Sequence, residues 1–200
     1  MDENVIKHIE SEEGNEDVLV FYDYRTLDID SLPKVGDYEQ IHLLAWSMGV
    51  WAAANVYPIL GVVANTFTAL NGTERPIDDH YGIPITAYTL TEKGLDERGR
   101  EKFFQRMLSN REDMVTFAQN KPQRALNEQK EELSAIRQLS RTRTATLHWD
   151  KVYCSEKDII FPFQNQQNWW QKRAPITVLP CGHYPFYCLK NWDDFIPKNA

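Results

Sequence analysis

A serine flanked by small residues constrains this chain more than any other feature of its sequence. Ser47 lies between Ala45 and Gly49, after an apolar run that begins at Ile41 and before an alanine-rich segment, residues 50–57. This is the sequence form of a nucleophile elbow, a sharp strand-to-helix turn that exposes a serine hydroxyl at the end of a sheet. The following helix favours negative charge at its N-terminus. The pattern predicts a nucleophilic Ser47 rather than a serine in an ordinary turn.

Strand-like and helix-like segments alternate around this motif. Apolar runs and turn signals predict strands and helices, and a long polar region favours helix. This alternation predicts an α/β fold with a mostly parallel sheet and a helical cap insertion, in a single domain spanning 1–200. The expected strands are 17–22, 41–46, 65–70, 149–154 and 176–179, and the expected helices are 48–60, 97–111, 122–139 and 185–196, with the cap at about 91–144.

A histidine and an aspartate follow later strands of the predicted sheet. Asp158 comes after the strand 149–154, and His183 comes after the strand 176–179. Serine is a poor nucleophile at neutral pH, so it needs a base and a third group that orients the base. The chain order Ser47, Asp158, His183 is that of the α/β hydrolases. Asp78 or Asp79, which follow an earlier strand, are alternative sources of the acid.

Composition excludes several classes of function. The net charge of −7 argues against general nucleic-acid binding, and no apolar run is long enough for a transmembrane helix. The acidic start lacks the features of a signal peptide, and three cysteines form no disulfide framework or zinc motif. We therefore expect a cytoplasmic protein without a metal. Residues 91–143 carry 12 Lys and Arg against 9 Asp and Glu, so this region could hold an anionic partner.

Several motifs together resemble the BioG family, over nearly the whole chain. Family members are α/β hydrolases that act as pimeloyl-[acyl-carrier protein] methyl ester esterases in biotin synthesis. The resemblance implies that Ser47, Asp158 and His183 form a catalytic triad, with no metal and no organic cofactor. The matching segments are Tyr22-Asp23-Tyr24-Arg25, the elbow region 45–53, Asn71-Gly72-Thr73 with Pro76-Ile77-Asp78, residues 158–162 with Asn165-Gln166, and His183-Tyr184-Pro185-Phe186.

The resemblance also implies a substrate and a partner. The substrate is a methyl ester at the far end of a pimeloyl chain, carried on the phosphopantetheine of an acidic acyl-carrier protein. An apolar slot for this chain is expected from the cap, and an acidic carrier could dock on the basic insertion. The candidate contacts for chain and carrier are Trp46, Phe103, Phe104, Met107, Arg124, Arg137, Arg141 and Arg143.

One departure from the family pattern concerns the oxyanion hole. Family members begin with an apolar strand that ends in a Gly-Trp-Gly loop, and this sequence has no counterpart of either. The Met48 amide supplies one oxyanion donor, while the second normally comes from that loop. We therefore expect an N-terminally truncated hydrolase fold. Two alternative functions stay open: a catalytically weakened protein that binds an acyl-carrier or another acidic partner, and a different acyl-ester hydrolase or acyltransferase.

Overall fold

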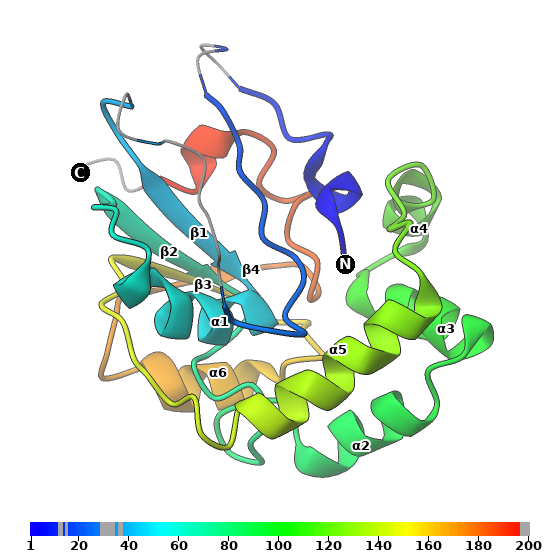
Figure 1. Cartoon of the computed structure of the whole chain (residues 1–200). Helices are drawn as coiled ribbons and strands as arrows, with labels where there is room; N and C mark the ends of the chain where they lie inside the picture. The colour runs from blue at the N-terminus through cyan, green and yellow to red at the C-terminus, as the bar shows by residue number, and fades with distance from the viewer. Residues whose placement is uncertain (12–13, 15, 29–34, 36–37, 197–200) are drawn as a thin grey trace.

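The computed structural model describes residues 1–11, 14, 16–28, 35 and 38–196. Its centre is a parallel sheet of four strands in the order β1-β2-β3-β4 (Figure 1). The register pairs His42 with Thr66 at the start of β1 and Trp46 with Leu70 at its end. All four strands therefore present their carboxyl ends at one edge, where sites form in open α/β sheets.

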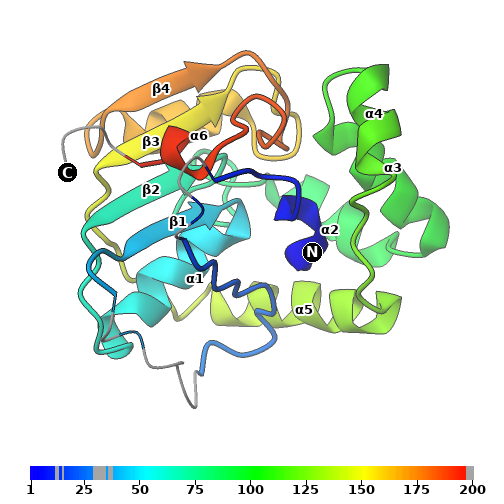
Figure 2. The same cartoon turned by 90° about the horizontal axis from the view of Figure 1, so that it is seen from above.

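The helices divide into two groups. Helices α1 and α6 cover one face of the sheet, whereas α2 to α5 lie together to one side of it (Figures 1 and 2). We call α2–α5 the helical insertion, since it lies between β2 and β3 in the chain. The strands are β1 His42–Trp46, β2 Thr66–Leu70, β3 Lys151–Ser155 and β4 Ile176–Leu179, and the helices are α1 Met48–Val56, α2 Ile85–Lys93, α3 Glu97–Met107, α4 Arg111–Phe117, α5 Leu126–Leu139 and α6 Phe163–Trp170, with 3-10 turns at Glu3–Ile6, Tyr57–Ile59 and Trp192–Asp194.

The core consists of two apolar clusters of buried side chains. Large aromatic side chains fill both, including Trp51 and Phe186 in one cluster and Trp149 and Trp170 in the other, all nearly inaccessible to solvent. Fully burying such side chains contributes roughly 1.5–3 kcal/mol each. Many of the aromatic residues of the chain therefore stabilise the core.

The expected strand 17–22 is not formed. The segment is extended but belongs to no sheet, and Val18, Leu19 and Phe21 are about half exposed. Its apolar pattern is that of a strand, but among the described residues no strand lies between this segment and β1 to pair with it. Among the described residues β1 therefore has one paired neighbour, β2, and its other edge is free.

The expected helix 185–196 is also wrong. Here the chain makes turns after Pro185 and then a parallel bridge between Glu10 and Asn191. The Glu10 amide donates to the Lys190 carbonyl, and the Trp192 amide donates to the Glu10 carbonyl. Because these hydrogen bonds use the backbone groups that a helix would need, the aromatic residues pack from an irregular segment instead.

Candidate active site

Ser47 occupies a strained turn between β1 and α1. Its φ of 58° and ψ of −124° are unfavourable for a residue with a side chain. The Ser47 amide donates to the Leu70 carbonyl at 2.8 Å, which fixes the turn against β2. A Cβ atom at Gly72 would lie 2.2 Å from the Ser47 carbonyl oxygen, so the turn after β2 requires glycine there. Contacts with β2 and with the turn that follows it therefore keep Ser47 in this strained conformation.

Ser47, His183 and Asp158 form a continuous line of hydrogen bonds. His183 Nε2 lies 2.9 Å from Ser47 Oγ, and His183 Nδ1 lies 2.8 Å from Asp158 Oδ2. His183 and Asp158 are buried, while Ser47 is partly accessible. In this geometry an imidazole can accept the serine proton while the carboxylate fixes its tautomer.

Asp158 is held by several donors besides His183. Its Oδ1 accepts hydrogen bonds from the amides of Ile160 and Phe161, and its Oδ2 accepts one from Gln166 Nε2. These donors fix the orientation of the carboxyl group beside His183. Gln166 is buried in α6 and was not expected in the site from the residue pattern; its presence beside Asp158 depends on the packing of α6 against β3.

The two alternative acids are engaged elsewhere. Asp78 Oδ1 accepts the amides of His80 and Tyr81, and Asp79 Oδ1 accepts the amide of Ile85 at the start of α2. Both side chains thus stabilise the loop that leads into the helical insertion. The hydrogen bond to His183 comes from Asp158.

The His183 backbone is fixed by two further side chains. Its carbonyl oxygen accepts hydrogen bonds from Trp46 Nε1 at 2.9 Å and from Asn71 Nδ2 at 3.0 Å. The Trp46 ring also lies 5.4 Å from the imidazole, centroid to centroid. Asn71, whose φ of 44° suits the turn after β2, is a contact that its turn-forming sequence alone does not reveal.

The buried thiol of Cys181, two residues before His183, does not compete with the serine. Burial raises the pKa of Cys181 to about 12, so at neutral pH it is a thiol and not a thiolate. Its Sγ lies 3.2 Å from Ser155 Oγ, whereas His183 Nε2 is hydrogen-bonded to Ser47 Oγ. Ser47 is therefore the group that His183 is placed to activate.

The helical insertion closes over these residues. The Tyr184 amide, next to His183, donates to the Met107 carbonyl at the end of α3. Phe103, Phe104 and Met107 line a cavity of about 1550 Å³ that also includes Ser47 and His183. The same cavity extends along the free edge of β1 to the extended segment at 17–24. The three expected apolar contacts are thus brought together with the serine.

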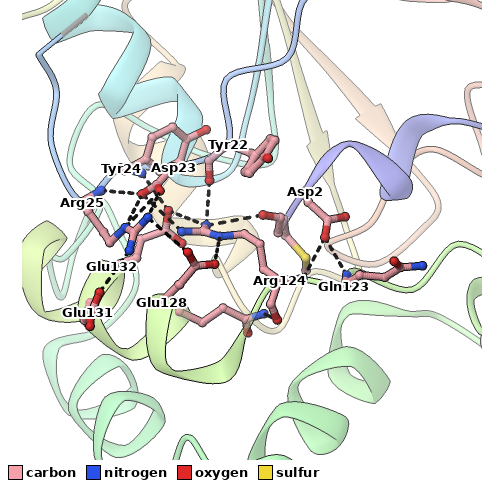
Figure 3. A network of polar contacts seen from close by, with 12 residues as sticks. Asp2, Tyr22, Asp23, Tyr24, Arg25, Gln123, Arg124, Glu128, Glu131 and Glu132 are labelled. Carbon is pink, nitrogen blue, oxygen red and sulfur yellow. Dashed lines mark hydrogen bonds and ion pairs between the residues drawn. The ribbon is translucent and has the colours of Figure 1, made fainter.

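Arg124 was expected to contact a carrier protein, and its position does not allow this. It is buried between α5 and the segment 22–25, where its guanidinium pairs with Asp23 at 3.2 Å and Glu132 at 2.9 Å (Figure 3). It also donates to the Tyr22 carbonyl at 2.9 Å. A buried, paired arginine cannot contact a protein docked at the surface. Arg124 instead joins the helical insertion to this segment.

The other three arginines differ in their availability. Arg137 is largely buried and pairs with Glu92 at 2.7 Å. Arg141 and Arg143 are exposed just after α5 and make no side-chain ion pair with any described residue, but they do not line the cavity. No group of three or more possible metal ligands occurs in the described part of the chain, and none of its helices is long and apolar enough to cross a membrane.

The parallel sheet, the strained serine turn and the hydrogen-bonded line to Asp158 define an α/β hydrolase fold. Similarity to solved structures agrees with this. One is a 2-hydroxy-6-oxo-6-phenylhexa-2,4-dienoate hydrolase from Rhodococcus sp. strain RHA1, with a TM-score of 0.55 and 16% identity over 78% of this chain and 60% of that one.

Within this class the family is defined by sequence and structure together. A family model described as pimeloyl-ACP methyl esterase BioG matches residues 2–195, and the chain belongs to this family. The crystal structure of BioG from Haemophilus influenzae aligns with a TM-score of 0.86 and 31% identity, over 96% of this chain and 88% of that one.

Sequence relatives include a longer protein with another name. A malonyl-[acyl-carrier protein] O-methyltransferase of Bacteroides fragilis is 42% identical over 88% of this chain. The chain spans about one third (36%) of that relative's length. An uncharacterized protein of Haemophilus influenzae is 34% identical over 89% of this chain and 81% of its own length.

Proposed function

We propose that the chain is a serine carboxylesterase of biotin synthesis that hydrolyses the methyl ester of a pimeloyl group carried on an acyl-carrier protein. The observation that carries the proposal is the Ser47–His183–Asp158 line of hydrogen bonds at the wall of a large, mainly apolar cavity. Membership of the BioG family supports the choice of ester and carrier. We place the reaction in the cytoplasm.

The reaction follows from the positions of these groups. His183 Nε2 takes the proton of Ser47 Oγ as the oxygen attacks the ester carbonyl, and Asp158 stabilises the resulting imidazolium. The Met48 amide begins α1 and donates no hydrogen bond to any described residue, so it is free to bind the oxyanion. His183 then gives the proton to the leaving methoxide, which departs as methanol. Water, activated by the same histidine, releases the pimeloyl carboxylate from Ser47.

The experiment measures methanol release and free carboxylate from pimeloyl methyl ester bound to a carrier protein. We expect turnover by the unchanged chain, and a loss on the order of 10⁴-fold or more in Ser47→Ala. Ser134→Ala is the matched control, since Ser134 is exposed on α5 and should leave turnover unchanged. Equal turnover by Ser47→Ala and Ser134→Ala would exclude Ser47 as the nucleophile.

The free edge of β1 favours a second candidate, a weakened hydrolase that binds an acyl-carrier without turning it over. With one oxyanion donor in place of two, the rate would fall by about 10²–10³. Saturable binding of the loaded carrier with no methanol release would identify this candidate. A different acyl-ester hydrolase would instead turn over p-nitrophenyl butyrate and leave the carrier-bound ester intact.

A further inference from the structure

Two cysteines enclose the loop that carries the general base. Cys181 and Cys188 are separated by six residues, and His183 is one of these. We call residues 181–188 the His183 loop. Cys181 is buried, Cys188 is exposed, and both are free thiols. Neither thiol takes part in the proposed esterase reaction, so that reaction does not account for their placement around His183.

The two thiols meet because the His183 loop folds back on itself. The Cys188 amide donates to the Pro185 carbonyl at 2.9 Å, which turns the chain back towards Cys181. The side chains of Cys181 and Cys188 are hydrogen-bonded to each other. The third cysteine, Cys154, is buried in a different apolar cluster from Cys181. Cys181 and Cys188 are therefore the two thiols that are in contact.

A chain of hydrogen bonds joins the Cys181 thiol to the backbone of His183. Cys181 Sγ lies 3.2 Å from Ser155 Oγ, and Ser155 Oγ accepts a hydrogen bond from Asn71 Nδ2 at 2.8 Å. The same Asn71 nitrogen donates to the His183 carbonyl oxygen at 3.0 Å. Cys181, Ser155, Asn71 and His183 are all buried. A change at the Cys181 sulfur therefore reaches the residue that must accept the Ser47 proton.

The exposed thiol is the one that an oxidant reaches first. Burial raises the pKa of Cys181, so its sulfur keeps its proton at neutral pH. When hydrogen peroxide oxidises the Cys188 thiolate, the O–O bond breaks, one oxygen stays on Cys188 as a sulfenic acid, and hydroxide leaves. Cys181 Sγ then attacks the Cys188 sulfur, the S–O bond breaks, and the Cys181 proton passes to the departing hydroxide. Two thiols and one peroxide thus give one disulfide and two waters.

We propose that Cys181 and Cys188 form a reversible disulfide that slows catalysis by His183, with hydrogen peroxide as the oxidant. The bond closes a ring that contains the base and draws the Cys181 sulfur away from Ser155. The Asn71 amide, which bonds both Ser155 and the His183 carbonyl, then loses part of its support. Displacement of a catalytic group by about 1 Å costs on the order of 10²-fold in rate. A small thiol reduces the bond by exchange and restores both cysteines.

The first test detects the bond without measuring turnover. Purified protein is treated with hydrogen peroxide, denatured, alkylated and digested with trypsin, which leaves both cysteines in the peptide 174–190. We expect this peptide to lose two hydrogen atoms and to escape alkylation, while Cys154 is alkylated. Cys181→Ser should stop at the sulfenic acid of Cys188, which dimedone traps. Alkylation of both loop cysteines after treatment, or a dimer linked through Cys188 of two chains, overturns the proposal.

The second test links the bond to catalysis. We expect hydrogen peroxide to lower kcat for p-nitrophenyl butyrate by about tenfold or more and to change KM little, and we expect dithiothreitol to restore the rate. Cys188→Ser is the matched control: because Cys188 is exposed, this variant should fold, start at the same rate and keep it after treatment. An equal loss in Cys188→Ser, or a full rate from protein that carries the bond, overturns the switch. Because the first test needs no turnover, failure of the proposed function leaves its result unchanged.

Discussion

Asp158 receives four hydrogen bonds, and one donor, Gln166, performs no chemistry of its own. Its Nε2 lies 3.1 Å from Asp158 Oδ2 and 2.7 Å from the Phe161 carbonyl oxygen. Its Oε1 is buried and accepts no hydrogen bond from the described residues. Because a buried unpartnered acceptor is unfavourable, the side chain is best explained by what its N–H groups hold. We infer that Gln166 fixes Asp158 in the orientation that meets His183.

Gln166→Met should lower kcat for a small ester by about tenfold and leave KM nearly unchanged. The reason is that Asp158 stabilises the imidazolium, which forms in the transition state and not on substrate binding. The control is Gln164→Met, since Gln164 is exposed on the same helix and bonds Asn168. Steady-state kinetics of both variants checks this. A rise in KM with unchanged kcat would mean that Gln166 acts on the cavity instead.

At the scale of single residues, the sequence indicates the reacting residues but not the residues that position them. Ser47, Asp158 and His183 each follow a parallel strand, so their common edge could be predicted before their distances were known. Gln166 and Asn71 could not, because an amide has no preferred partner until the fold brings one to it. The prediction that Arg124 contacts the carrier protein was wrong for a similar reason, because a count of charges does not tell which arginine is buried.

The elements are predicted where the pattern is strong and local. The four strands of the sheet and the helices α1, α3 and α5 occur within a few residues of expectation. The short helices α2, α4 and α6, of nine, seven and eight residues, were not expected. The strand expected at 17–22 depends on a neighbour that the described chain does not provide, and pairing is not a local property.

Glu74 links the turn after β2 to the segment that leads into β3, and its contribution to stability should depend on pH. It is buried after β2, and its Oε1 accepts hydrogen bonds from the Leu147 amide and Trp149 Nε1, just before β3. Burial raises the pKa of Glu74 above its ordinary value of 4.5, and these hydrogen bonds oppose the shift only in part. The folded state therefore holds this proton more tightly than the unfolded state does.

The contribution of Glu74 to stability should be greatest below pH 4.5 and fall as the pH rises through its folded-state pKa. Glu74→Gln removes the charge and keeps an oxygen acceptor. We expect the difference in free energy of unfolding between the unchanged chain and this variant to move in favour of the variant over that range. Denaturant unfolding at pH 4 and pH 7 measures it. The opposite trend would mean that the carboxylate, and not the acid, is stabilised by folding.

The whole molecule combines a nearly complete hydrolase frame with one open feature. The sheet, the helical insertion and the cavity arrange a serine, a base and an acid as an esterase requires. Beside them β1 keeps a free edge in the described structure, and the extended segment 17–28 lies near it, held by Arg124 and Glu132 rather than by strand pairing (Figures 1 and 3). Nucleophilic attack needs only the serine, the base and the acid, whereas full stabilisation of the oxyanion needs a second donor besides the Met48 amide.

Covalent labelling by a fluorophosphonate probe tests most directly whether Ser47 is a nucleophile activated by His183. We expect the label on Ser47, located by mass spectrometry of the peptide, and none on Ser47→Ala. His183→Ala should react slower by about 10²-fold or more, because the general base is lost. His148→Ala, which removes an exposed histidine, should react like the unchanged chain. Equal labelling with and without His183, or a label that persists in Ser47→Ala, would contradict the account.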